Sequence, residues 1–261
     1  MQVIAVLFAL VLALPPLGAD LAPTGTLRAT FIANNPVQGR VDAQTGAASG
    51  PAPDLARELA RRLGVPHAVI PLPSAGAVME SVTTGKADIG FLAYEAARAT
   101  QVDFSDPYLL SGSAYAVRAD SSIRNSADVD RAGVTVGAVT GQSQEVWVRE
   151  HIRSARINAI PTVPANAVLA AMLVDGRVDA FAANRTRMEE LARAFPAIRV
   201  LADNFLMIGQ AIVVAKGDRT RLDEVNRFLA EVRAAGFVKA SIDRANIPGV
   251  EVATGNGAIG R

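Results

Sequence analysis

The segment "TGQS" at Thr140–Ser143 carries the clearest chemical signal in the sequence. It follows an apolar strand candidate and opens a stretch with helical spacing, so its backbone N–H groups lie at the start of a helix. Free N–H groups at a helix start, together with the helix dipole, favour an anion. The alternative is that Ser143 only caps the helix, although one side chain can do both. We therefore predict an anion-binding role for this segment.

The residue types needed for common enzyme chemistry are mostly missing. The chain has no cysteine, and His67 and His151 are far apart and expected at the surface. No Gly-rich phosphate loop, metal-ligand cluster or Ser-His-Asp set is visible. Glu95 with Asp88 could form an acid–base pair, but Asp88 begins a strand candidate, which favours a structural role. We therefore predict no catalytic residue, no metal site and no cofactor.

A repeated pattern places Asp88 within the architecture. "GKADIGFLA" at Gly85–Ala93 returns as "GRVDAFAAN" at Gly176–Asn184. Each copy follows a stretch with helical spacing, and each glycine suits the left-handed position at a helix end. The pattern predicts a helix, a turn and a buried strand that begins at aspartate. Two copies indicate two lobes.

Short apolar strands alternate with amphipathic helices along the chain, which predicts an α/β fold with parallel sheets covered by helices. The strongest helix is "PDLARELARRLG", for which Asp54 is the expected cap and Gly64 the end. The last helix, "RLDEVNRFLAEVRAAG", presents an apolar stripe to the core. The inward residues predicted for it are Leu222, Val225, Phe228, Leu229 and Val232.

The N-terminus predicts export. "MQVIAVLFALVLALPPLGA" is an apolar run followed by two prolines and small residues, which is typical of a signal peptide cleaved after Ala19. The run is too short to cross a bilayer comfortably. The net charge is +1 with both signs mixed, which disfavours a nucleic-acid partner. We expect a periplasmic monomer.

The order of motifs between and around the two copies resembles the bacterial periplasmic solute-binding proteins of family 3, the amino-acid-binding components of ABC importers. The matching features are the two repeated patterns, Arg98, "VDFSDPY" at Val102–Tyr108 and "VGAVTGQS" at Val136–Ser143. The resemblance covers about residues 26–247. "VDFSDPY" after an arginine is fairly specific, and we expect it to form a strand and a turn set by Asp106 and Pro107.

The resemblance implies the two-lobe, type II fold of periplasmic binding proteins, with a ligand between lobes that close on it. Lobe 1 would comprise residues 20–111 and 210–261, and lobe 2 residues 112–209. The chain would deliver its solute to the membrane permease of an ABC transporter.

The resemblance also implies site residues. Arg98 matches the arginine that grips the ligand carboxylate, for which a planar guanidinium is suited. Ser143, beside Gln142, matches the hydroxyl that donates to the same carboxylate. Asn184 stands where amino-acid binders carry an aspartate that pairs with the α-ammonium group. The remaining candidates are Phe91 and Ala93 in the loop "FLAYEAAR", and Asn35 in "ANNPV".

Three departures from the family pattern fall in this presumed pocket. Asn184 lacks the negative charge, Asn34 or Asn35 replaces a frequent aromatic residue, and the loop with Glu95 is shorter than usual. A buried ammonium group without a paired anion is costly. An α-amino acid should therefore bind weakly unless Glu95 supplies the charge.

The sequence is compatible with two classes of function. The favoured one is a solute-binding protein that captures a small carboxylate-bearing solute, an amino acid or a related acid. The alternative is a periplasmic enzyme on the same fold, such as a dehydratase of a cyclic carboxylic acid, with Glu95 as the acid, because fold does not fix function.

Overall fold

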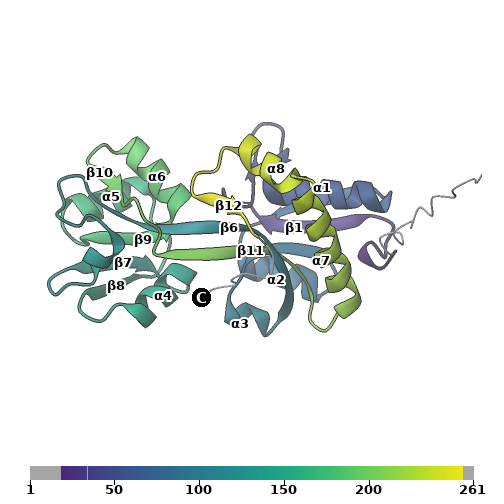
Figure 1. The fold of residues 1–261 in the computed structure, drawn as a ribbon, viewed down its shortest axis with the longest axis horizontal. Coiled ribbons are helices and arrows are strands. Elements are labelled where there is room, and N and C mark those ends of the chain that lie inside the picture. The colour runs from purple at the N-terminus through teal and green to yellow at the C-terminus, as the bar shows by residue number, and fades with distance from the viewer. Residues whose placement is uncertain (1–18, 34, 255–261) are drawn as a thin grey trace, which may run out of the picture.

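The computed structural model of the protein describes residues 19–33 and 35–254 (Figure 1). No helix within these residues is long and apolar enough to cross a membrane. The apolar run that predicts a signal peptide lies outside the described residues, apart from Ala19 at its end.

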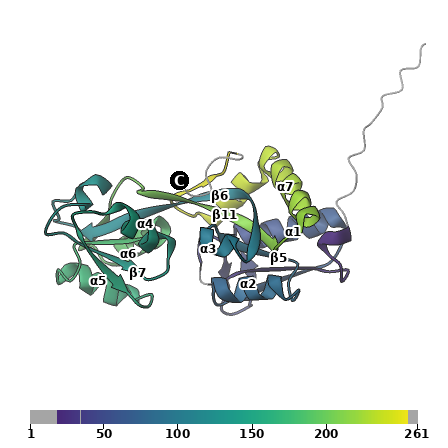
Figure 2. The ribbon, with the colours of Figure 1, turned by 90° about the horizontal axis from the view of Figure 1, so that it is seen from below.

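Two lobes are joined by two long antiparallel strands, β6 (Val102–Arg118) and β11 (Leu206–Ala215), which run from one lobe into the other (Figures 1 and 2). The two strands make the sheets of both lobes continuous, in the order β4-β1-β5-β11-β6-β9-β7-β8. The expected lobe boundaries, residues 112 and 209, fall inside these crossing strands. The α/β two-lobe architecture predicted from the sequence is confirmed.

Lobe 1 is built on three parallel strands, with β1 between β4 and β5. Helix α2 covers one face, packed through Val78 and Val82, while α1, α7 and α8 cover the other around Phe31 and Phe228. The elements of this lobe are β1 (Leu27–Ile32), α1 (Pro51–Leu63), β4 (His67–Leu72), α2 (Ala75–Thr83), β5 (Ile89–Ala93), α3 (Ala96–Ala99), α7 (Arg219–Ala234) and α8 (Phe237–Ala245).

Lobe 2 repeats this plan with β7 between β8 and β9. Helices α5 and α6 pack on one face around Phe181, and α4 packs on the other through Val148 and Trp147. Its elements are β7 (Thr135–Val139), α4 (Ser143–His151), β8 (Arg156–Ile160), α5 (Asn166–Val174), β9 (Ala180–Asn184), α6 (Arg185–Ala194) and β10 (Ile198–Val200). The short pieces elsewhere are β2 (Arg40–Val41), β3 (Ala48–Ser49), β12 (Val250–Val252) and 3-10 turns at Ala19–Leu21 and Ser126–Val129.

The repeated sequence pattern forms the same structure in both lobes. Gly85 and Gly176 follow α2 and α5 with φ of 70° and 71°. The Asp88 carboxylate then accepts the backbone N–H of Arg28 at 2.8 Å, and the Asp179 carboxylate accepts that of Thr135 at 2.7 Å. Each aspartate thus fixes the start of its strand beside the neighbouring strand. The structural role predicted for Asp88 is confirmed.

Two local expectations are corrected. "VDFSDPY" contains no turn, because β6 continues through Pro107, and the register between β6 and β11 shifts at Ala211, which pairs with Pro107. Helix α1 begins earlier than expected, at Pro51, where the fixed proline φ suits the first turn. Asp54 therefore does not cap it, and its carboxylate accepts hydrogen bonds from Ser241 and Arg244 of α8.

Candidate functional site

A cavity of about 140 Å³ lies where the two lobes face each other. Lobe 1 contributes the ends of β1 and β5 and the start of α3, lobe 2 contributes the start of α4 and the end of β9, and β11 crosses beneath. The lining residues are Ile32, Asn35, Ala93, Glu95, Arg98, Gln142, Ser143, Gln144, Asn184, Ile208 and Gln210. Six of the seven site residues predicted from the sequence therefore meet at one cavity.

Arg98 lies on α3, and its guanidinium reaches the end of β5 at the cavity. Its Nη1 donates to the carbonyl of Ala93 at 2.9 Å, and its Nη2 lies 3.0 Å from Oε1 of Glu95. The Arg98 side chain is 18% exposed, and burial lowers the pKa of its guanidinium while Glu95 opposes that shift. Arginine stays charged despite such shifts, so Arg98 remains a cation with further N–H donors available to a ligand.

Glu95 joins the two lobes. Its Oε1 accepts a hydrogen bond of 2.5 Å from the Ser143 hydroxyl on α4, in addition to its ion pair with Arg98. Among the described residues, its second oxygen, Oε2, accepts no hydrogen bond. The sequence indicates Glu95 as a candidate acid or as a partner for an ammonium group, whereas its contact with Ser143 depends on how the lobes face each other.

The start of α4 offers donors to the cavity. The N–H groups of Glu145 and Val146 bond to the carbonyl of Gln142. Within the described part of the chain, the N–H groups of Ser143 and Gln144 make no hydrogen bond, as is usual in the first turn of a helix. Together with the helix dipole they favour a negative group near Ser143.

A group of amides fixes the lobe 2 side of the cavity. Gln144, a buried residue of α4, donates from Nε2 to Oδ1 of Asn184 and to the hydroxyl of Ser113, both at 2.9 Å. The Asn184 oxygen is therefore engaged by Gln144. The sequence could have indicated Gln144, because it follows Ser143 directly in the first turn of α4.

A second group of amides links the lobe 1 side to the crossing strands. Gln38 accepts the N–H of Ile32 at 2.9 Å and donates to Oε1 of Gln210 at 3.2 Å. Gln210 donates in turn to the hydroxyl of Ser111 at 3.2 Å. Sequence reasoning missed both glutamines, although a polar residue inside the apolar run "MIGQAIVV" is a usable signal.

The remaining predicted residues differ in their positions. Asn35 lines the cavity, and its Oδ1 accepts the N–H of Val37 in a local turn. Gln142 and Ala93 also line it. Phe91 does not: it is 1% exposed, and its ring packs edge-on against Tyr108 in the core of lobe 1. Phe91 shares a face of β5 with Ala93 but lies further from the end of the strand, where the core of lobe 1 beneath α1 and α7 encloses its side chain.

The cavity pairs one cation with one anion in a setting of neutral donors and acceptors. Arg98 and Glu95 are the charged residues of its lining; amides and Ser143 add hydrogen bonds, and Ile32, Ile208 and Ala93 add apolar surface. No group of acidic residues, histidines or cysteines in the described ranges is arranged to hold a metal ion. This arrangement can bind a small polar molecule that carries charge.

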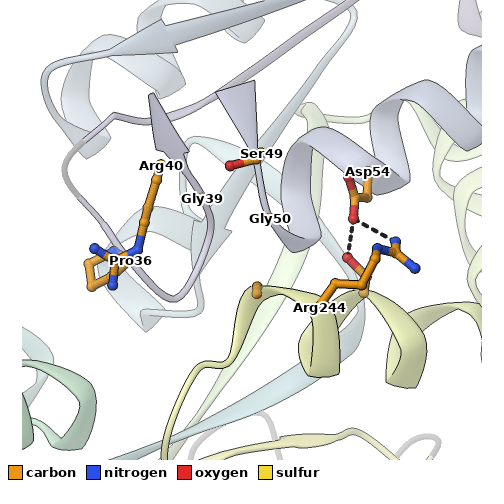
Figure 3. Close-up of a pocket in the computed structure, with 9 residues that line it drawn as sticks. Pro36, Gly39, Arg40, Ser49, Gly50, Asp54 and Arg244 are labelled. Atoms are coloured by element: carbon orange, nitrogen blue, oxygen red, sulfur yellow. Dashed lines mark hydrogen bonds and ion pairs between the residues drawn. The ribbon is translucent and has the colours of Figure 1, made fainter. Parts of the chain in front are cut away.

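A larger cavity of about 320 Å³ on lobe 1 is a weaker candidate (Figure 3). It lies between β2, β3 and α8, and lobe 2 contributes nothing to its lining. Its carboxylate, Asp54, is bound by Ser241 at 2.5 Å and Arg244 at 2.8 Å. Since Asp54 is already paired with Arg244 of lobe 1, and Arg40 with Glu190 of lobe 2, we place the functional site at the interlobe cavity.

Comparison with known proteins shows which family the chain belongs to. Residues 29–244 match the family described as bacterial extracellular solute-binding proteins, family 3. The chain belongs to this family. The likeness to family 3 noted in the sequence is thereby confirmed, and so is its class, the substrate-binding proteins of amino-acid ABC transporters.

Individual relatives bind amino acids. The L-cystine-binding protein TcyJ of Escherichia coli is 26% identical over 191 residues, which cover 72% of this chain and 70% of TcyJ. The ancestral amino-acid-binding protein AncCDT-1, described as a precursor of cyclohexadienyl dehydratase, is 27% identical with a TM-score of 0.67, covering 86% and 97% of the chains. A Wolinella succinogenes ABC transporter component complexed with lysine shares the fold, with a TM-score of 0.69, 22% identity and coverage of 84% and 95%.

Proposed function

We propose that this protein captures a small carboxylate-bearing solute, an amino acid or a related acid, between its lobes and delivers it to the permease of an ABC importer. The observation that carries the proposal is the meeting of Arg98 from lobe 1 with the N-terminus of α4 from lobe 2 at one cavity. Both are donors suited to a carboxylate. Neither a metal nor a cofactor is part of the proposal.

Export follows from the same proposal. The apolar N-terminal run is removed after Ala19, and the mature protein works in the periplasm as a monomer. Mass spectrometry of periplasmic material should give a mature chain that begins at Asp20. An intact Met1 on cytoplasmic protein would contradict this part of the proposal.

The test of binding is a thermal-shift panel of amino acids and small carboxylates. A ligand at 100 times its dissociation constant stabilises the protein by about 2.7 kcal/mol. Arg98→Ala should abolish the shift for the best ligand, because a hydrogen bond to a charged group contributes about 1.5–3 kcal/mol. Arg61→Ala is the matched control, since Arg61 lies on α1 with a side chain that is 70% exposed. Equal shifts in wild type and Arg98→Ala would contradict the assignment.

The enzyme alternative is not favoured. The relatives named above are binding proteins, although AncCDT-1 is described as a precursor of a dehydratase. The discriminating measurement is whether the purified protein converts a cyclic carboxylic acid or only binds it stoichiometrically. Turnover that Glu95→Gln abolishes would establish the enzyme instead.

A further inference from the structure

We propose that Glu95 determines which solutes this cavity accepts. Its carboxylate occupies the anion position between Arg98 and Ser143, so an incoming carboxylate must displace it, and the displaced Glu95 then binds the ammonium group of the same solute. This inference rests on the proposed function and narrows the ligand class to zwitterions.

The Glu95 carboxylate contacts the side chains of Arg98 and Ser143. Oε1 of Glu95 lies 3.0 Å from Nη2 of Arg98 and accepts the Ser143 hydroxyl at 2.5 Å. These are the two side chains proposed to hold the solute carboxylate. A solute oxygen that contacts both Nη2 of Arg98 and the Ser143 hydroxyl therefore lies close to the position of Glu95 Oε1.

The net charge of the cavity favours a zwitterion over a simple acid. Arg98 and Glu95 neutralise each other, and both side chains are largely buried, at 18% and 19% exposed. A simple acid that displaces Glu95 leaves two carboxylates around one guanidinium, and an excess charge in a partly buried site is costly. A zwitterion brings one charge of each sign and leaves the cavity neutral.

Glu95 is better suited than Asn184 to bind the ammonium group of the solute. Asn184 carries no charge, and its oxygen already accepts a hydrogen bond from Gln144. Glu95 is the acidic residue of the cavity lining, and among the described residues its Oε2 accepts no hydrogen bond. Glu95 can therefore supply the negative charge for the ammonium group, which Asn184 cannot.

A purely local ion pair does not account for these contacts. An i,i+3 pair at the start of α3 needs no partner from another lobe, and such a pair contributes little by itself. The Ser143 hydroxyl reaches Glu95 from α4 of lobe 2. The Glu95 carboxylate thus bridges the lobes as a bound solute is proposed to do.

The experiment compares amino acids with their desamino analogues by isothermal titration. The pairs are alanine and propanoate, glutamine and 4-carbamoylbutanoate, leucine and 4-methylpentanoate, arginine and 5-guanidinopentanoate, and cystine and 3,3′-dithiodipropanoate. Wild-type protein should bind the amino acid of its best pair more tightly by about tenfold or more, the contribution of one charged hydrogen bond. Glu95→Gln keeps the shape but removes the charge, so this ratio should fall by about tenfold, with the desamino acid binding more tightly than to wild type.

The control is Glu190→Gln, which removes the carboxylate that Arg40 contacts at 2.8 Å across the lobes but outside this cavity. Its ratio should equal that of wild type. If wild type binds a pair and Glu95→Gln leaves the ratio unchanged, the inference about Glu95 is overturned while the proposed function stands. If no member of any pair binds wild type, the proposed function fails and this inference fails with it.

Discussion

The negative charge of the cavity is on Glu95 in lobe 1, whereas the family pattern places it at position 184 in lobe 2. Asn184 instead belongs to the group of amides around Gln144. The negative charge of the cavity is thus in lobe 1, and Arg98 and Ser143 line the same cavity.

If Glu95 supplies the negative charge of the cavity, a carboxylate at position 184 should be able to substitute for it. Adding Asn184→Asp to Glu95→Gln should restore the preference for an amino acid over its desamino analogue by about tenfold, because it returns one carboxylate to the cavity. Titration of the matched pairs measures the ratio. Asn184→Ala in the same background is the control, and a restored ratio in that variant would show that charge is not the cause.

The candidate site was only partly predictable at the residue scale. Arg98, Ser143 and Asn184 could be found because each occupies a recognisable position in a motif. The bond between Glu95 and Ser143 joins residues 48 positions apart on different lobes, so it depends on the placement of whole elements. The sequence does not show that Phe91 lies outside the cavity, because Phe91 and Ala93 share one face of an apolar strand and are distinguished by their distance from its end.

At the scale of elements, the two aspartates that directly precede β5 and β9 should differ in their effect on stability. Asp88 is 1% exposed and binds Arg28 through the backbone N–H and through the guanidinium, at 2.6 Å. Asp179 is exposed and accepts the N–H of Thr135. We expect Asp88→Ala to lower the free energy of unfolding by about 2–4 kcal/mol and Asp179→Ala by about 1 kcal/mol.

Urea unfolding measures both changes. Asp175→Ala is the control, since Asp175 has a 59% exposed side chain and lies in the same turn as Asp179. Equal losses at Asp88 and Asp179 would mean that the ion pair with Arg28 contributes nothing beyond the backbone hydrogen bond.

The packing of α1 predicts a pH dependence of stability. The hydrogen bond from Arg61, followed by the one from Arg62, lowers the pKa of Glu58 to about 2 against the opposing effect of burial. A carboxyl whose pKa is lowered by folding stabilises the protein above its unfolded pKa and loses that contribution as pH falls through the folded value. The contribution of Glu58 is therefore complete above about pH 4.5 and lost near pH 2.

Glu58→Gln should lower the free energy of unfolding by about 1–2 kcal/mol at pH 7, a figure reduced for the exposure of Arg61. The difference from wild type should vanish as the pH approaches 2. Denaturant titrations of both proteins between pH 2 and pH 7 measure it. A constant difference over this range would show that the substitution acts through packing.

Most elements could be predicted because helical spacing, glycine ends and apolar strands agree along much of the chain. Gly64 ends α1 and the apolar stripe of α7 is buried, as predicted. The proline in "VDFSDPY" misled because its local turn signal is overridden by pairing with β11. That pairing joins residues about a hundred positions apart, which no short window can detect.

At the scale of the whole molecule, the two crossing strands predict bending between lobes. If a solute bound by residues of both lobes draws them together, small-angle scattering should show a smaller radius of gyration when the ligand is added. The Arg98→Ala variant at the same ligand concentration is the control, because it should remain unchanged. Binding demonstrated without compaction would contradict the closing motion.

The position of β11 has a consequence for how the chain folds. It pairs with β5 and with β6, so Gln210 lies opposite Ala93 on one side and Leu109 on the other. A chain that emerges N-terminus first cannot complete the sheet of lobe 1 until residues 206–215 are available, whereas β7, β8 and β9 of lobe 2 lie within one uninterrupted stretch. Such long-range pairing slows folding. We therefore expect lobe 2 to be able to fold before the sheet of lobe 1 is complete.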